Sequence, residues 1–115
     1  MKFGHMELFV ENPEISRDFY VEVLGFTETV VLHKDLIWIA HGDFEILLKK
    51  GNAHKAKDYQ TASHGLVLYT DDLEAEKQAL LKRGLEFKGF DGSEKCLTFT
   101  DPDGHWLQLV NPNDH

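Results

Sequence analysis

The stretch HMELFVENPEISRDFYVEVLGF, residues His5 to Phe26, decides the fold because the chain uses its pattern twice. It matches GLVLYTDDLEAEKQALLKRGLEF, residues Gly65 to Phe87, in an alignment that sets Leu8 against Leu68. In both copies an apolar strand ends on acidic or amide residues, and an amphipathic helix follows. The sequence therefore predicts a duplicated unit.

The predicted helices have recognisable ends. In the first copy Asn12 is a good N-cap and Gly25 can end the helix in a left-handed conformation. In the second copy Asp71 or Asp72 takes the capping role, and Gly84 ends the helix. The apolar residues expected on one face of the first helix are Ile15, Phe19, Tyr20, Val23 and Leu24.

The later parts of the two copies also match. IWIAHGDFEILL, residues Ile37 to Leu48, resembles LTFTDPDGHWLQLV, residues Leu97 to Val110, and both predict strand, tight turn, strand. Ile37 aligns with Leu97 in the same frame as the first strands, and the extra residue in the second turn then brings Leu47 against Gln108. Gln108 is therefore the polar counterpart of an apolar position.

Each half is predicted to be a β-α-β-β-β module, with its weakest strands at residues 27–32 and 86–90. We expect one domain in which residues 1–49 form the first module, residues 50–63 a polar linker and residues 64–112 the second module. A helix covers one face of each sheet. The predicted class is α+β, with the two modules forming a partly open mixed β-barrel.

Composition excludes several classes of function. The chain has 115 residues, 42% of them hydrophobic, and a net charge of −8 with no basic run, so nucleic-acid binding is not expected. No apolar run approaches the roughly 20 residues of a membrane span. The single cysteine, Cys96, forms no internal disulfide and favours a small buried side chain in a reducing cytoplasm.

Strand alternation separates two faces of the predicted sheets. Phe44, Ile46 and Leu48 are expected to pack inward on the fourth strand, for example, which leaves its alternate residues on the opposite face. That opposite face is expected to be concave, and its aromatic and polar side chains suit a small-molecule pocket. The residues assigned to it are His5, Glu7, Phe9, Glu45, Leu47, Val67, Tyr69, Trp106 and Gln108.

The combination of SRDFYVEVLGF, GLVLYTDDLEA and the terminal FTDPDGHWLQLV resembles the vicinal oxygen chelate superfamily. That superfamily includes glyoxalase I, bleomycin and fosfomycin resistance proteins, extradiol dioxygenases and methylmalonyl-CoA epimerase. The resemblance covers nearly the whole chain and implies paired β-α-β-β-β modules, commonly assembled as homodimers. It does not specify a reaction, because this fold supports many.

The resemblance also implies four places for metal ligands, on the first and fourth strands of each module. They fall on His5, Leu47, Gly65 and Gln108, so only the first holds a strong ligand. His64 lies one position before its place, which puts its side chain on the wrong face unless a bulge intervenes. A catalytic metal usually has three protein ligands.

The leading hypothesis is a metal-independent protein of the bleomycin-resistance kind, which binds a cationic or amine-bearing small molecule in the concave groove. The alternative is a lyase, isomerase or dioxygenase that uses Zn, Ni, Mn or Fe, with His5, His64 and Glu7 as ligands. A third possibility is a groove that serves only dimerisation. His54 is expected to be exposed in the linker, and His105 is expected to face either solvent or a pocket rim.

Overall fold

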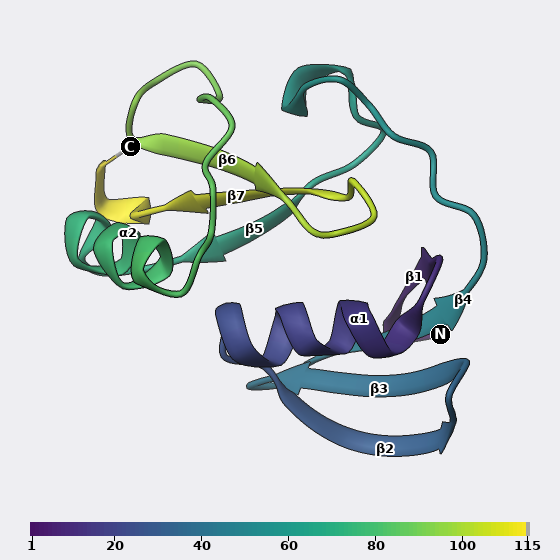
Figure 1. Ribbon diagram of the computed structural model, residues 1–115. Helices are drawn as coiled ribbons and strands as arrows, with labels where there is room; N and C mark the ends of the chain where they lie inside the picture. The colour runs from purple at the N-terminus through teal and green to yellow at the C-terminus, as the bar shows by residue number, and fades with distance from the viewer. Residues whose placement is uncertain (115) are drawn as a thin grey trace. The chain divides into compact units, whose positions relative to one another are not determined.

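The computed structural model describes residues 1–114 and consists of two compact units. The first comprises Met1–Ala53, and the second begins at His54, within the predicted linker. Each unit contains one mixed sheet and one principal helix, as Figure 1 shows by the sequence colouring. The predicted α+β class is confirmed. Within residues 1–114 neither sheet closes on itself, which agrees with the open arrangement expected.

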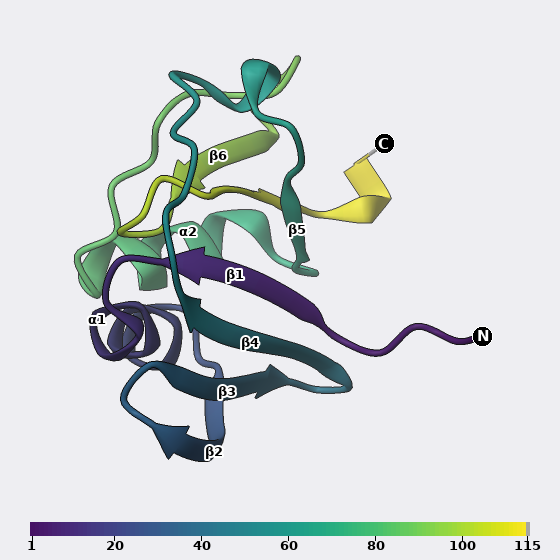
Figure 2. The same cartoon turned by 90° about the vertical axis from the view of Figure 1, so that its right-hand side faces the viewer.

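The first unit has four strands in the order β1, β4, β3, β2 (Figure 2). Their bounds are Met6–Val10 for β1, Thr27–His33 for β2, Leu36–His41 for β3 and Phe44–Lys50 for β4. β1 runs parallel to β4, whereas β4 with β3 and β3 with β2 are antiparallel. β2 is therefore an edge strand, and every one of its residues is exposed.

The helix of the first unit begins as α1, Pro13–Asp18, and continues as a π-helical turn η1, Phe19–Val23. It lies against one face of the sheet, where Figure 2 shows it almost end-on. The predicted apolar face was wrong at Ile15, which is 56% exposed. Ile15 lies beside the buried stripe, whose members are Pro13, Ser16, Tyr20 and Leu24.

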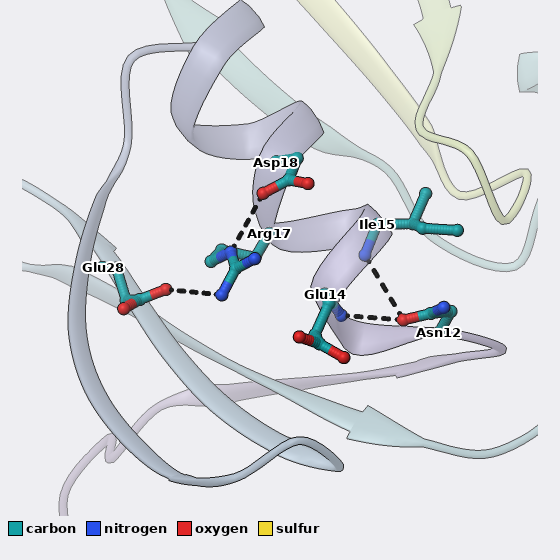
Figure 3. Close-up of polar contacts among 6 residues, drawn as sticks. All are labelled: Asn12, Glu14, Ile15, Arg17, Asp18 and Glu28. Carbon is teal, nitrogen blue, oxygen red and sulfur yellow. Dashed lines mark hydrogen bonds and ion pairs between the residues drawn. The ribbon is translucent and has the colours of Figure 1, made fainter.

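Two side chains fix this helix at its ends (Figure 3). Asn12 is the N-cap, as predicted, and its Oδ1 accepts the amide of Glu14 at 3.0 Å. Arg17 donates to Asp18 at 3.0 Å and to Glu28 on β2 at 3.1 Å. Burial opposes the charge of Arg17, but the hydrogen bonds to the two carboxylates raise its pKa overall. The contact with Glu28 joins α1 to the edge strand.

The second unit has three strands in the order β5, β7, β6, with β5 parallel and β6 antiparallel to β7. The bounds of its elements are Tyr59–Thr61 for the 3₁₀ turn η2, Leu66–Tyr69 for β5, Leu73–Lys82 for α2, Cys96–Thr100 for β6, Trp106–Val110 for β7 and Pro112–Asp114 for the 3₁₀ turn η3. The strand predicted at residues 86–90 was wrong, because this segment contributes only an isolated bridge from Phe90 to Leu97 and two backbone hydrogen bonds with Thr98. Gly89, at φ 91°, interrupts an extended conformation there.

The duplication predicted from the sequence is present in the strand register. Glu7 pairs with Leu47 in the first sheet, and Val67 pairs with Gln108 in the second. The sequence alignment sets Glu7 against Val67 and Leu47 against Gln108, so the two pairs are equivalent. The two modules therefore share one backbone plan around the positions assigned to the groove.

One face of each sheet packs under its helix, as the alternation predicted. The buried residues of this face are Leu8, Val10, Ile37, Ile39, Ile46 and Leu48 in the first unit, and Leu97, Phe99, Leu107 and Leu109 in the second. The inward prediction for Phe44 was wrong, because it is 47% exposed beside the β3–β4 turn. No helix among residues 1–114 is long and apolar enough to cross a membrane.

Candidate functional site

A group of polar and aromatic side chains lies on the outer face of the first sheet, opposite α1. The register places Glu7 beside Leu47 and Leu47 beside Trp38, so the three share this face. The imidazole of His5 meets the Trp38 ring edge-on, with 4.5 Å between centroids. His5 Nε2 lies 3.0 Å from Glu7 Oε2, and Lys49 Nζ lies 3.7 Å from Glu7 Oε1. We call His5, Glu7, Trp38 and Lys49 the first-sheet cluster.

The carboxylate of Glu7 is the electrostatic centre of the first-sheet cluster. Its hydrogen bond with His5 is the largest influence on its pKa and lowers it; burial opposes this, and the charge of Lys49 lowers the pKa further. The side chain is 37% exposed, so the carboxylate is ionised at neutral pH and in contact with solvent.

The other predicted residues of the first unit lie on the same face as this cluster but differ in their exposure. Phe9 and Glu45 are exposed on the same face, whereas Leu47 is buried. The ring of Phe9 lies against Gly51, where a Cβ would approach Phe9 Cδ1 to 3.0 Å. A side chain at position 51 would therefore push the ring aside. The first sheet thus offers aromatic surface next to an exposed carboxylate.

The equivalent face of the second sheet is filled by the chain itself. Gln108 is only 7% exposed, and its Nε2 donates to Asp91 Oδ2 at 3.0 Å. Gln60, in η2, donates to Asp91 Oδ1 at 3.2 Å and to the carbonyl oxygen of Phe90 at 3.0 Å. We call Gln60, Asp91 and Gln108 the second-sheet network. This network therefore occupies the side-chain amide of Gln108, which the sequence analysis predicted to contact a ligand.

Two aromatic contacts cover further parts of this face, at Trp106 and at Gly65. Trp106 is buried, and its Nε1 donates to the carbonyl oxygen of Ala56 at 3.0 Å. The ring of Tyr59 occupies the space beside Gly65, since a Cβ there would lie 2.7 Å from its Cε2 and Cζ atoms. Gly65 is the counterpart of His5 in the repeat, so an aromatic ring from the linker takes the place of a ligand side chain.

The remaining predicted residues, Val67 and Tyr69, lie on β5 and are exposed, Tyr69 by 73%. The structure brings His5 and Glu7 together, and it holds Trp106 and Gln108 in internal hydrogen bonds. The nine predicted residues therefore divide between an accessible face in the first unit and a largely occupied face in the second.

The donors at the four family places do not fit a metal ion. Leu47 is aliphatic, the space at Gly65 contains the Tyr59 ring, and the Gln108 amide is bonded to Asp91. His64 is exposed, with its Nδ1 3.2 Å from Ser63 Oγ. Across residues 1–114, no three His, Cys, Asp or Glu side chains are grouped as metal ligands. Only His5 is a strong ligand at its place.

Cys96 is buried, as predicted. Burial and the nearby charge of Asp91 both raise the pKa of its thiol, so the thiolate is disfavoured at neutral pH. The positive charge of the neighbouring Lys95 does not lower the pKa of the thiol overall. Cys96 is a core residue rather than a nucleophile.

Sequence reasoning missed four members of the two groups, namely Trp38, Lys49, Gln60 and Asp91. The sequence could have indicated Trp38, because it aligns with Thr98 in the repeat. Strand alternation would also have placed it on the same face of the sheet as Leu47. Lys49 was assigned to the boundary of the linker, although it belongs to β4. Asp91 gives no periodic signal, since it lies in a loop outside the strands.

Comparisons with known proteins agree with this architecture. Residues 2–109 match the family model of the Glyoxalase/Bleomycin resistance protein/Dioxygenase superfamily. No curated protein sequence matches the chain significantly. Among solved structures, TnmS3, an antibiotic binding protein from Streptomyces sp. CB03234, is 26% identical with a TM-score of 0.69, and the alignment covers 97% of this chain and 98% of that one.

Two further solved structures share the fold at lower identity. Lactoylglutathione lyase from Agrobacterium tumefaciens is 14% identical with a TM-score of 0.73, over 96% of this chain and 93% of that one. The fosfomycin resistance protein FosX from Listeria monocytogenes is 16% identical with a TM-score of 0.74, over 95% of this chain and 91% of that one. With the family model spanning residues 2–109 and both modules in place, the chain belongs to the Glyoxalase/Bleomycin resistance protein/Dioxygenase superfamily, the vicinal oxygen chelate superfamily that the sequence resembles.

Proposed function

We propose that this protein binds a small organic molecule on the outer face of its first sheet and does so without a metal ion. The observation that carries the proposal is the first-sheet cluster, in which the His5 imidazole contacts both the Trp38 ring and the exposed carboxylate of Glu7. Such a combination offers both apolar contact area and one directional polar group. On the second sheet the polar position of the corresponding face, Gln108, is buried and bonded within the second-sheet network, which leaves only Val67 and Tyr69 of the predicted residues exposed there.

The chemistry of the cluster favours a ligand that carries an amine. Glu7 presents an ionised carboxylate, and Glu45 adds a second negative charge on the same face. A cation held by Glu7 would share this face of the sheet with Trp38 and Phe9, and aromatic rings attract positive charge through their π-electrons. Lys49 already approaches Glu7 at 3.7 Å, so an incoming amine would compete with a loose, exposed ion pair.

The likeness to TnmS3 supports the same class of function. That protein is an antibiotic binding protein, and at 26% identity its alignment covers nearly all of both chains. We transfer from it only the general function, the binding of a small molecule without further chemistry. The identity of the ligand must come from experiment.

A thermal-shift screen of amine-bearing aromatic compounds tests this proposal. A compound that binds the native state raises Tm by mass action, by an amount that grows with its concentration. We expect at least one compound to raise Tm in the parent protein and to lose most of that effect in Glu7→Gln. The matched control is Glu22→Gln, which removes the same charge from an exposed position in η1. Equal losses in both variants would contradict a site at Glu7.

The competing function is a metal-dependent lyase, isomerase or dioxygenase, and His5 is the observation that favours it. His5 occupies a ligand place of the family and contacts Glu7, a second potential ligand, at 3.0 Å. Metal analysis of protein purified without an affinity tag distinguishes the two functions. A stoichiometric divalent ion that is lost in His5→Ala would favour the enzyme. Cytoplasmic location and assembly as a homodimer stay predictions, and solution mass tests the latter.

A further inference from the structure

A pocket of about 350 Å³ lies in the second unit. It is formed by the start of the unit, by the segment that precedes β5, and by the turn that leads into β7. Its lining residues are His54, Lys55, Ala56, Thr61, Ala62, Ser63, His64, Gly104, His105 and Trp106. A volume of this size is within the range of small-molecule sites.

The charge of this pocket is opposite to that of the chain. The chain has 20 acidic and 12 basic residues, yet no carboxylate is among the described residues that line the pocket. Its wall holds one lysine and three imidazoles instead. Lys55 and His54 form no hydrogen bond or ion pair with any described residue, so their N–H groups remain available for a ligand. Such a donor-rich wall suits an anion.

The position of Lys55 depends on a glycine. Its Cγ lies 2.9 Å from where a Cβ would stand on Gly104, which also has a φ of 85°. The aliphatic part of the lysine therefore lies directly over the turn backbone, and any side chain at 104 would displace it. Lys55 therefore lines the pocket with its aliphatic part packed on this turn.

The opposite wall is held rigidly. His105 Nδ1 lies 2.8 Å from Asp101 Oδ2, and the carboxylate also accepts the amide of His105 at 2.9 Å. Asp101 has a fully buried side chain, so it fixes the ring while staying out of the pocket. Trp106, bonded to Ala56, adds an apolar wall at the same end. The pocket thus combines cationic and N–H groups with an aromatic surface.

We propose that this pocket is a second ligand site, which binds a small organic molecule through an oxyanion such as a phosphate. Lys55 supplies the charge, His54 and His64 supply N–H donors, and Trp106 contacts the organic part. All of its residues belong to the second unit, and they select a ligand of the opposite charge to that expected at the first-sheet cluster.

Titration of ¹⁵N-labelled protein with phenyl phosphate, followed by NMR, tests this site. We expect saturable shifts of the amides of Ser63 and Gly104 and of the Trp106 indole N–H. Phenol, which lacks the oxyanion, is expected to cause no saturable shift. Lys55→Gln should weaken phenyl phosphate binding about tenfold, the effect of losing one charged hydrogen bond.

The control is Lys57→Gln, which removes the same charge two positions away at an exposed place outside the pocket. We expect it to leave the affinity within twofold of the parent. Equal weakening in the two variants would show nonspecific attraction and overturn the proposal, as would an absence of saturable shifts in the parent. A titration with inorganic phosphate identifies the source of the anion. An affinity weaker than that of phenyl phosphate indicates that the site binds an organic ester, and an equal affinity indicates that it binds the free ion.

Discussion

The two modules place equivalent residue pairs in the same register, yet the outer faces of their two sheets differ in exposure. Glu7 and Leu47 lie on a face where the carboxylate is accessible, whereas Gln108, the partner of Val67, is enclosed by the second unit itself. The backbone plan is common to both. The segments outside the strands determine whether the outer face of a sheet stays accessible or is covered by the chain itself.

The enclosing contacts come from the segment before β5 and the loop before β6. Gln60 and Asp91 approach Gln108 from these segments, and Tyr59 takes the place beside Gly65. A buried amide must be paired, because an unpaired polar group costs about 1–3 kcal/mol of stability. Gln108 therefore has a structural role in the second module, while Glu7 keeps its freedom to bind in the first.

The largest effect is expected from Gln108→Glu. This change places a second carboxylate where the amide now donates to Asp91, in a position that is 7% exposed. Repulsion and burial would raise the pKa of the new carboxylate above its unfolded value, so the folded state would bind the proton more tightly. The loss of stability should be small near pH 4 and reach about 3 kcal/mol at neutral pH.

Urea denaturation at several pH values measures this loss. Asn52→Asp, which adds the same charge at an exposed loop position, is the control and should change stability little. If Gln108→Glu instead leaves stability intact and confers binding of a divalent ion, the assignment of the second face as occupied is wrong.

Removal of the central acceptor should have the next largest effect. Asp91→Ala leaves the Nε2 groups of Gln60 and Gln108 without their carboxylate partner, which should lower the free energy of unfolding by about 2 kcal/mol. Asp91→Asn keeps one acceptor and should recover part of the loss. Asp43→Ala, at an exposed turn of the first unit, should have little effect on the denaturation midpoint. A similar shift in that control would argue against a specific network.

A smaller loss is expected when a methyl group is placed under the Tyr59 ring. Gly65→Ala forces the ring to move and should destabilise the protein by about 1 kcal/mol. Gly4→Ala, where nothing lies within 4 Å, is the counterpart that should be neutral. Thermal unfolding of the two variants measures the difference. Equal Tm values would mean that Tyr59 does not fill the second face.

The smallest effect concerns the first face. The hydrogen bond with His5 lowers the pKa of Glu7, so His5→Ala should return that pKa toward its ordinary value. Because the folded pKa is depressed, the interaction stabilises the protein above the unfolded pKa of about 4.3 and is lost as pH falls through the folded value. A ¹³C NMR titration of the Glu7 carboxyl measures this directly. An unchanged pKa in the variant would remove His5 from the cluster.

Much of the fold could be predicted from the sequence because its signals are local or periodic. The alignment of the two copies made Leu47 and Gln108 equivalent, and the strand register confirms it. Strand parity placed Glu7 and Gln108 on the outer faces. Strand alternation could not show which of the two outer faces stays exposed. The contacts that cover the second one, Asp91 with Gln108 and Ala56 with Trp106, join positions that are far apart in the chain.

The second-unit pocket was beyond sequence reasoning for a similar reason. His105 was expected to face either solvent or a pocket rim and His54 to be exposed in the linker, but nothing in the spacing joins them. They meet because the chain before β5 folds back near the turn at Gly104. Turn chemistry predicted the turn itself, and only the three-dimensional structure shows what gathers beside it.

The proposed function requires that its ligand binds the first-sheet face at Glu7 and leaves Gln108 on the second-sheet face untouched. The most direct measurement is NMR shift mapping of ¹⁵N-labelled protein with a compound that raises Tm in the screen. The account predicts shifts for Glu7, Lys49 and the Trp38 indole, while the side-chain amide of Gln108 keeps its position. Saturable shifts of the Gln108 amide and of Asp91, with the first-sheet cluster unchanged, would contradict it.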